Sequence, residues 1–254
     1  MVDTHAHLSL CEPPLAELVA AAREAGVHRI LEIGLGEESN PAAIAAANEH
    51  EEVWAAVGRH PNGARGFDDG AAANLRDLSG EDAVRAIGET GIDLYREGAP
   101  LADQRRSFAA QIEIAAARSL PLVIHVRDRA GETAAVDEVF DTLRGADGFP
   151  VILHCFSAPQ RVDDAAERGW YCSFAGNVTY RASEALREAA ARVPEELILV
   201  ETDSPFLAPQ ARRGKPNQPA FVTETAEVVA AARGVEAGEL EALVERNAQR
   251  LFRW

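Results

Sequence analysis

Two histidines one residue apart, His5 and His7, lie in the apolar run VDTHAHL at residues 2–8. Alternate residues of a strand point to the same face, so a strand here would present both imidazoles together. An H-x-H pair alone is a modest signal, because a single histidine beside a strand is usually a hydrogen-bonded structural residue. A metal site would require further His, Asp or Glu at compatible positions.

Residues of these types follow several apolar, β-branched segments later in the chain. Two carboxylates, Glu89 in AIGETG and Asp203 in ETDSP, stand at the ends of such segments. Five of the seven histidines also do so: His5, His7, His60, His125 and His154. The structural alternative for Glu89 and Asp203 is a solvated loop carboxylate or a helix N-cap. That alternative explains Glu89 poorly, because its surroundings are apolar and rich in glycine.

The ligand types predict a two-ion metal centre. Imidazole and carboxylate together suit Zn, Mn, Fe, Co or Ni better than Ca, and Mg also stays open. Four histidines and two carboxylates exceed what one tetrahedral ion uses, but they fit two divalent ions if Glu89 bridges them. The first ion would be held by His5, His7, Glu89 and Asp203. The second would be held by Glu89, His125 and His154.

The elements that must position these residues alternate along the whole chain. Candidate strands cover residues 2–5, 29–33, 53–57, 84–87, 122–125, 151–154, 170–174 and 197–201, with amphipathic helical patterns between them. Strict alternation indicates a parallel sheet, and eight units predict a (β/α)8 TIM barrel with extra C-terminal helices around residues 220–232 and 238–252. An open doubly wound sheet is the competitor, but no dinucleotide-binding or P-loop motif follows the first strand. No linker composition divides the chain, so residues 1–254 are expected to form one domain.

Composition limits the partners that the protein can bind. The formal net charge is −16, which disfavours a broad footprint on duplex nucleic acid. Three cysteines without a C-x-x-C pair argue against a disulfide framework and a thiolate zinc site. No segment is long and apolar enough to span a membrane, and no signal peptide pattern is visible, so a cytoplasmic location is expected. The sequence leaves the oligomeric state open, with a monomer compatible with it.

A series of motifs resembles one family of hydrolases. DTHAHL, GRHP, GETGID, HVRD, HCFS, SFAG, ETDSPFLAP and RGKPNQP occur in the order seen in TatD-like metal-dependent hydrolases, a branch of the amidohydrolase-type barrels. The resemblance covers essentially the whole chain. It implies a distorted barrel, a divalent-metal centre and hydrolysis of phosphodiester or related ester bonds, often at DNA ends, as in a 3'-5' exodeoxyribonuclease. The family's metal positions fall on His5, His7, Glu89, His125, His154 and Asp203.

The same resemblance assigns a substrate side to the site. His60, Arg127, Arg213 and Lys215 fall in motifs that look like substrate-binding elements. Three positions depart from the family pattern without removing a ligand, and they bear on substrate preference: Arg59 before His-Pro, Val126 before Arg127, and Ala158 after HCFS.

Local charge reconciles such a substrate with the acidic composition. Two divalent ions would bring four positive charges, and Glu89 and Asp203 bring two negative ones. The net charge at the site is then about +2 before any arginine is counted. A divalent ion lowers the pKa of bound water to about 7, and Asp203 is the expected acceptor of the water proton, with Glu89 as the bridge. A positive site in a negative body suits a single-stranded or frayed DNA end, or another small phosphoester. No series of aromatic residues that would stack on successive bases is visible.

Two other functions stay open from the sequence. The first is a C–N or C–O amidohydrolase, such as a lactonase, cyclic amidase or aminoacyl-ester deacylase, on the same metal ring. Relatives of this barrel often bridge their metals with a carboxylated lysine, but no lysine stands at a predicted strand end here. The second is a metal-stabilised scaffold without activity, which is disfavoured because structural sites are usually closed and tetrahedral.

Overall fold

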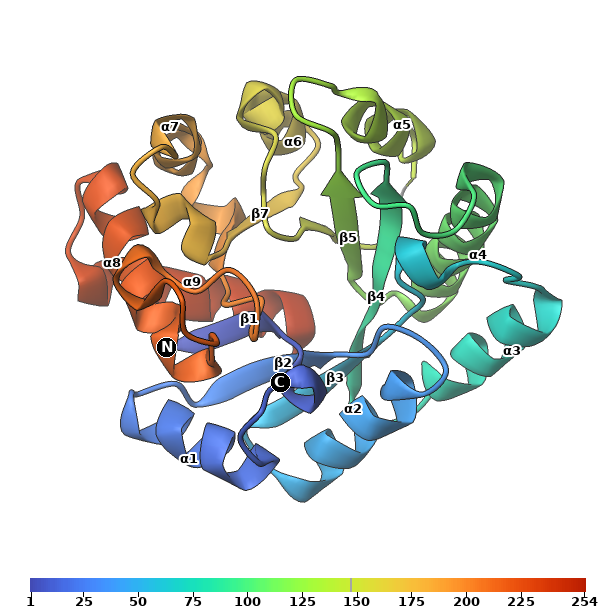
Figure 1. The fold of residues 1–254 in the computed structure, drawn as a ribbon, viewed down its shortest axis with the longest axis horizontal. Coiled ribbons are helices and arrows are strands. Elements are labelled where there is room, and N and C mark those ends of the chain that lie inside the picture. Colours follow the sequence, from blue (N-terminus) through green and yellow to red (C-terminus); the bar gives the residue numbers. More distant parts are fainter. Residues whose placement is uncertain (147) are drawn as a thin grey trace.

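The computed structural model describes residues 1–146 and 148–254, which form an eight-stranded parallel sheet in the order β1 to β8. Figure 1 shows the strands in the middle and the helices around them. The predicted (β/α)8 barrel is confirmed. The strands are β1 (Val2–Ala6), β2 (Arg29–Ile33), β3 (Val53–Val57), β4 (Val84–Asp93), β5 (Leu122–Arg127), β6 (Val151–Leu153), β7 (Tyr171–Phe174) and β8 (Ile198–Val200).

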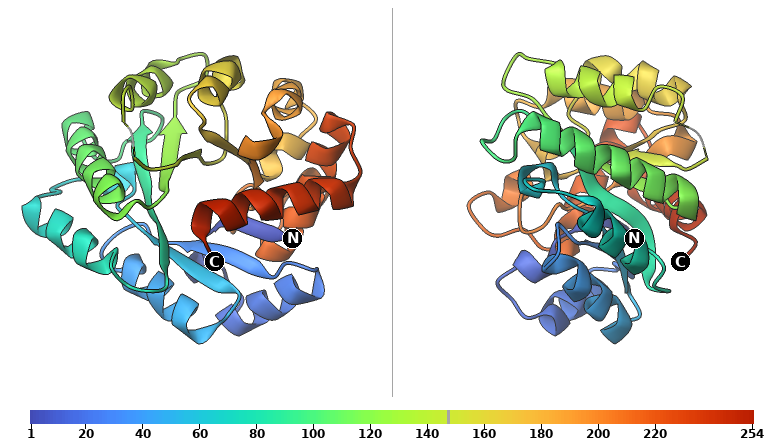
Figure 2. Two further views of the ribbon diagram at one scale, coloured as in Figure 1. Left: turned by 180° about the vertical axis from the view of Figure 1, so that it is seen from behind. Right: turned by 90° about the vertical axis from the view of Figure 1, so that its right-hand side faces the viewer.

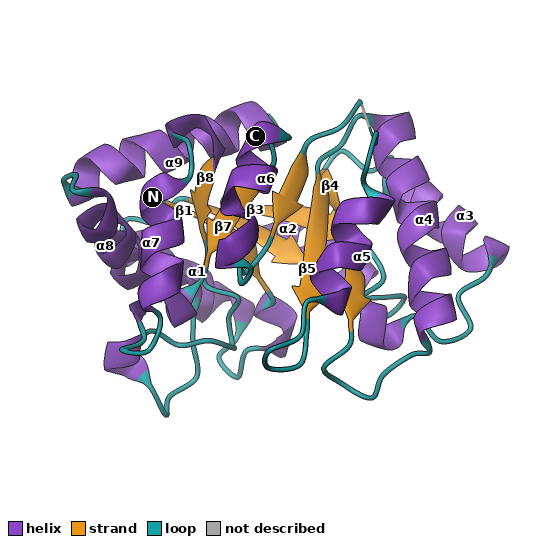
Figure 3. Ribbon diagram, turned by 90° about the horizontal axis from the view of Figure 1, so that it is seen from above, coloured by secondary structure: helices purple, strands orange, loops and turns teal. Residues whose placement is uncertain are grey.

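Helices follow the strands as the apolar periodicity predicts, and their inward faces pack on the sheet. They are α1 (Leu15–Glu24), α2 (Ser39–Glu49), α3 (Asp69–Leu78), α4 (Leu101–Arg118), α5 (Ala134–Thr142), α6 (Val162–Glu167), α7 (Glu184–Arg192), α8 (Val222–Arg233) and α9 (Ala237–Phe252). The last two are the predicted C-terminal helices. Helix α9 lies against β1 and β8, near both chain ends (Figure 2). Seen from above, the helices flank the strands on both sides (Figure 3).

Strand β4 differs most from its predicted extent, because it continues from residue 87 to Asp93. The added segment GETGID is buried throughout, so it forms part of the barrel wall rather than a loop. Two short helical turns open the loops above the site, η1 (Leu8–Leu10) after β1 and η2 (Pro61–Gly63) after β3. No helix in the described part of the chain is both long and apolar enough to cross a membrane.

Strands β8 and β1 are joined by an isolated bridge, by backbone hydrogen bonds beyond it and by side-chain hydrogen bonds. An isolated bridge joins Ala6 to Ser204, and the backbone N–H of His7 donates to the Ser204 carbonyl over 2.8 Å. Lower in the strands, the hydroxyl of Thr4 donates to the Val200 carbonyl over 3.0 Å. The first and last strand ends are therefore held side by side, and the residues that follow them face one another.

Candidate metal centre

Local irregularities in two strands position the central side chains. Three residue steps along β1, from Asp3 to Ala6, are paired with only two residue steps along β2. In the same way, three steps along β4, from Ile87 to Thr90, are paired with two steps along β5. A bulge of this kind bends a strand and redirects the side chain within it. His5 lies in the first bulge and Glu89 in the second.

Glycines make the second bulge feasible. Gly91 has a φ of +135°, and a Cβ placed there would lie 2.1 Å from the carbonyl oxygen of His125. A Cβ on Gly58 of the β3 end would lie 2.3 Å from the carbonyl carbon of Gly88. Only glycine allows such conformations and close approaches. The GETG sequence therefore brings three strand backbones together under Glu89.

Four side chains converge on one point above β1. The Nε2 atoms of His5 and His7 lie 3.2 Å apart, and each lies 3.6 Å from Oε2 of Glu89. Oδ1 of Asp203 lies 3.8 Å from Nε2 of His5 and 3.4 Å from Nε2 of His7. Ligand atoms about 2.0–2.2 Å from a tetrahedral ion lie roughly 3.3–3.6 Å from one another. This arrangement, here named the first cluster, therefore suits a single ion at its centre.

The other oxygen of Glu89 faces a second set of histidines, here named the second cluster. Oε1 of Glu89 lies 3.3 Å from Nε2 of His154, 3.6 Å from Nε2 of His60 and 2.6 Å from Nδ1 of His125. The first distance suits two ligands of one ion, whereas 2.6 Å is the separation of two atoms that share a proton. An ion held by His125 and Glu89 would therefore replace that proton. The second cluster fits an ion only after this exchange.

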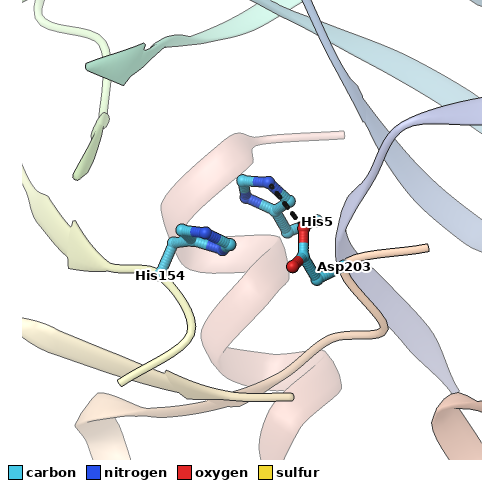
Figure 4. Close-up of side chains that lie close together, drawn as sticks. All are labelled: His5, His154 and Asp203. Atoms are coloured by element: carbon cyan, nitrogen blue, oxygen red, sulfur yellow. Dashed lines mark ion pairs between the residues drawn. The ribbon is translucent and has the colours of Figure 1, made fainter. Parts of the chain in front are cut away.

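The two clusters are continuous through His154. Its ring stacks on that of His5, with centroids 3.7 Å apart, and Asp203 lies beside His5 (Figure 4). The structure thus groups the predicted ligands slightly differently from the sequence analysis, because His60 joins Glu89 and His125 while His154 also meets the first cluster. Three overlapping sets have ligand atoms within 4.8 Å of one another: His5, His154 and Asp203; His5, His7 and Glu89; and His60, Glu89 and His125.

Outer partners orient several of these imidazoles. Nδ1 of His7 donates to the Ile33 carbonyl over 3.1 Å, and Nδ1 of His154 donates to Oε1 of Glu201 over 2.7 Å. Once the ring is neutral, donation from Nδ1 leaves the Nε2 lone pair facing the centre, as a metal ligand requires. Glu201 also accepts the N–H of Cys155 over 2.9 Å, so it fixes both the ring and the backbone after β6.

Sequence reasoning missed the role of two carboxylates. Glu201 lies two residues before Asp203, and Asp93 closes the GETGID motif with Oδ2 3.2 Å from Nε2 of His125. Both are buried and adjoin predicted ligands. The available signals were the position of Glu201 at the end of a predicted strand and the place of Asp93 in the GETGID motif, and neither reveals which imidazole the carboxylate meets.

His60 is the opposite tautomer to His7 and His154, because its Nδ1 accepts a hydrogen bond instead of donating one. Its Nδ1 accepts the backbone N–H of Asn62 over 3.1 Å, so the proton of the neutral ring lies on Nε2 and points toward Glu89. Burial, reinforced by the nearby His125 and His7 against the attraction of Glu89, lowers the pKa of His60 to about 4. The ring is therefore neutral near pH 7. It offers an N–H donor rather than a lone pair.

The two central carboxylates, Glu89 and Asp203, require compensating positive charge. Although burial opposes its ionisation, the neighbouring His154 and His60 and the hydrogen bonds from His125 and His154 hold the pKa of Glu89 well below its ordinary value. Burial likewise opposes ionisation of Asp203, but the hydrogen bond with His7 lowers its pKa. Buried carboxylates are costly unless cations compensate them. Within the described residues the ion pairs of Glu89 and Asp203 are all with histidines, so protons on imidazoles fill the place that metal ions would take.

Of the predicted substrate residues, His60 lies in the second cluster, whereas Arg127, Arg213 and Lys215 lie at or beyond the ends of β5 and β8. Arg127 ends β5 and is exposed, with its guanidinium carbon 4.1 Å from the ring centre of Tyr95. Arg213 lies 4.7 Å over Tyr180, and Lys215 is exposed in the same loop.

The three departures from the family pattern lie outside the two clusters. Arg59 is turned to its own loop, where it donates to the Gly63 carbonyl over 2.6 Å. Val126 packs on the core and Ala158 is buried.

Comparisons with known proteins identify the family and support the fold. The sequence profile described as TatD related DNase matches residues 2–253. The chain belongs to the TatD-related DNase family. It is 33% identical over 258 residues to the Bacillus subtilis protein YabD, which is named an uncharacterised metal-dependent hydrolase, and the match covers 100% of this chain and 99% of YabD. The resemblance inferred from the motifs is thus confirmed.

Two other TatD-related proteins extend the comparison. The chain is 37% identical over 243 residues to the Cronobacter sakazakii protein named 3'-5' ssDNA/RNA exonuclease TatD, covering 93% of this chain and 90% of that one. The crystal structure of YjjV, a TatD homologue from Escherichia coli K12, superposes with a TM-score of 0.90 and 25% identity, covering 100% of this chain and 98% of YjjV. This TatD-family protein is a metal-dependent hydrolase.

Proposed function

We propose that this hydrolase removes nucleotides from the 3' ends of single-stranded nucleic acid, with DNA as its main substrate. The observation that carries the proposal is the position of Glu89. One of its oxygens faces His5 and His7 at 3.6 Å, and the other faces His154 at 3.3 Å. A carboxylate placed between two sets of imidazoles suits a two-metal hydrolase, a class that includes nucleases and phosphatases. The exonuclease name of the Cronobacter relative supports the same substrate class.

The donor set assigns the ligands of the two proposed ions. The first cluster would hold one ion through His5, His7, Glu89 and Asp203. The second cluster would hold another ion through Glu89, His125 and His154. When bound, divalent ions activate water as a nucleophile and neutralise charge on a transferring phosphoryl group. Mixed imidazole and carboxylate ligands suit Zn, Mn, Fe, Co or Ni, and the substrate oxygens would complete the coordination of any of them.

The side chains of this chain supply orientation and proton transfer. Asp203 stands at the edge of the first cluster on a left-handed backbone with φ 56°, and its N–H donates to the His5 carbonyl over 2.9 Å. Its carboxylate can hold the attacking water and accept a proton from it. His60, which presents Nε2–H from the other side of Glu89, can donate to a phosphate oxygen or to the leaving oxygen. Arg127 at the rim can bind the next phosphate.

A glutamine at position 89 tests this proposal. Glu89→Gln keeps the volume of the side chain but removes the bridging charge, so we expect loss of bound metal and no cleavage of a 5'-labelled single-stranded oligonucleotide above background. Exposed Glu97 provides the matched control, and Glu97→Gln is expected to behave as the wild type. Retained cleavage by Glu89→Gln, or wild-type protein that hydrolyses amides or lactones but no oligonucleotide, would refute the proposal.

A further inference from the structure

Three large apolar side chains are exposed in the described part of the chain. They are Leu10 (47% exposed), Tyr95 (52%) and Phe206 (47%). Each lies in the loop that follows the carboxyl end of a strand: Leu10 after β1, Tyr95 after β4 and Phe206 after β8. All three therefore belong to the rim of the mouth above the metal centre.

Tyr95 and Phe206 lie on opposite sides of this mouth. The strands follow one another in the order β1 to β8 around the barrel, so β4 and β8 are separated by half of the ring. Glu89 projects from β4, and Asp203 follows β8. The two aromatic rings therefore flank the line along which a bound strand would cross the two clusters.

Tyr95 is fixed relative to the second cluster. Oδ1 of Asp93 accepts its backbone N–H over 2.8 Å, while Oδ2 of the same carboxylate lies 3.2 Å from Nε2 of His125. The N–H of Leu94 donates to the Arg127 carbonyl over 2.9 Å, which ties this loop to the end of β5. The guanidinium carbon of Arg127 lies 4.1 Å from the ring centre of Tyr95. With the cation over its ring and half of the side chain exposed, Tyr95 offers a preformed planar surface.

Phe206 is fixed relative to the first cluster. Its N–H donates to the Asp203 carbonyl over 2.8 Å, and its own carbonyl accepts from Nδ2 of Asn217 over 2.7 Å. Its ring centre lies 6.1 Å from that of His7, at an angle of 69°. The exposed ring therefore adjoins a proposed metal ligand, and the backbone that carries it is held by the buried Asn217.

We infer that Tyr95 and Phe206 are stacking sites for two unpaired bases, one on each side of the phosphodiester bond that is cleaved. The inference rests on the proposed nuclease function. Stacking on an aromatic ring tolerates any base, because every base has a π-face. A base inside a duplex already stacks on its neighbours, so this device selects single-stranded ends. It also provides binding energy that a chain with a net charge of −16 does not obtain from a broad basic surface.

The test uses three 5'-labelled oligothymidylates: one intact, one without the base of the 3'-terminal nucleotide, and one without the base of the next nucleotide. We expect wild-type kcat/KM to fall roughly 5- to 150-fold for each missing base, the range of base–aromatic stacking. Tyr95→Ala should cleave the intact oligonucleotide and one of the two base-lacking oligonucleotides with equal kcat/KM. Phe206→Ala should do the same for the other base-lacking oligonucleotide. Tyr95→Trp should retain the wild-type discrimination. Leu10→Ala is the matched control, because Leu10 shares the rim and the exposure but has no π-face.

The outcomes separate this inference from the function on which it rests. Equal cleavage of all three oligonucleotides by the wild type would overturn the stacking sites and leave the nuclease proposal intact. The same would follow if Tyr95→Ala and Phe206→Ala kept both discriminations, as they would if the rim bound a partner protein instead. Absence of cleavage of every oligonucleotide by the wild type would overturn the nuclease proposal itself. Metal content measured in each variant should equal that of the wild type.

Discussion

Asp3 of the first strand holds Thr202 at the end of the last one. Its Oδ1 accepts the backbone N–H of Thr202 over 2.9 Å, and its Oδ2 accepts the Thr202 hydroxyl over 2.6 Å. Oδ1 also accepts the N–H of His5 over 3.3 Å. All three residues are buried. One buried carboxyl group, whose pKa burial raises to about 8, therefore helps to close the barrel and sets His5 beside Asp203, the residue that follows Thr202.

Removal of the Thr202 hydroxyl should destabilise the protein. Thr202→Val keeps the shape of the side chain but leaves the Asp3 carboxyl group without one donor and the Ser204 N–H without its acceptor. An unsatisfied buried polar group costs about 1–3 kcal/mol. We expect a loss of that size in the free energy of unfolding of metal-free protein, measured by urea denaturation.

A second threonine–aspartate pair provides the control for this substitution. The hydroxyl of Thr133 donates to Oδ2 of Asp137 over 2.9 Å at an exposed position. Water can replace the partner there, so Thr133→Val should have a smaller effect. Equal effects of the two substitutions would contradict the role assigned to Asp3.

The sequence predicted seven of the eight strand ends to within two residues, and it named six candidate ligands that the structure brings together, because both depend on local pattern. Alternation of apolar segments and helical periodicity fixes where strands stop, and parallel strands bring those ends to one face. The extension of β4 was missed, since the glycines of GETGID resemble a turn until the approach of the β5 backbone is known. The pairing of Glu201 with His154 depends on a contact across the barrel, which no local pattern encodes. The tautomer of His60 depends instead on the short turn in which its Nδ1 accepts the N–H of Asn62, and the side-chain geometry of that turn is known only from the structure.

Glu201 is expected to act through His154. Glu201→Gln removes the carboxylate that orients Nδ1–H of His154, and loss of such a partner typically lowers metal affinity or activity 10- to 100-fold. Isothermal titration with Mn²⁺ and the rate of oligonucleotide cleavage should both show a loss in this range. Exposed Glu196 is the control, and Glu196→Gln should leave both measurements unchanged. Unaltered metal affinity in Glu201→Gln would exclude this positioning role.

Metal binding should release protons at neutral pH. Burial opposes protonation of His7, but the carboxylates of Asp203 and Glu89 raise its pKa to about 9. At pH 7 metal-free His7 therefore carries a proton on the nitrogen that the ion needs, and binding must expel it. Affinity should rise with pH up to about 9 and then level off. Titration calorimetry in two buffers of different ionisation enthalpy would measure about one proton or more released at pH 7. Release that is zero at pH 7 would contradict the assignment of His7 as a ligand.

His60 should affect catalysis without affecting metal content. Because its Nδ1 accepts from Asn62, the neutral His60 ring presents a protonated Nε2 to the second cluster as a donor. The neutral rings of His7 and His154 would instead present Nε2 lone pairs. His60→Ala removes one donor from the developing charge, which typically lowers kcat by about 10²- to 10³-fold. Metal analysis should still find the wild-type number of ions. A variant that loses an ion together with its activity would instead make His60 a ligand of the second cluster, with its proton on Nδ1.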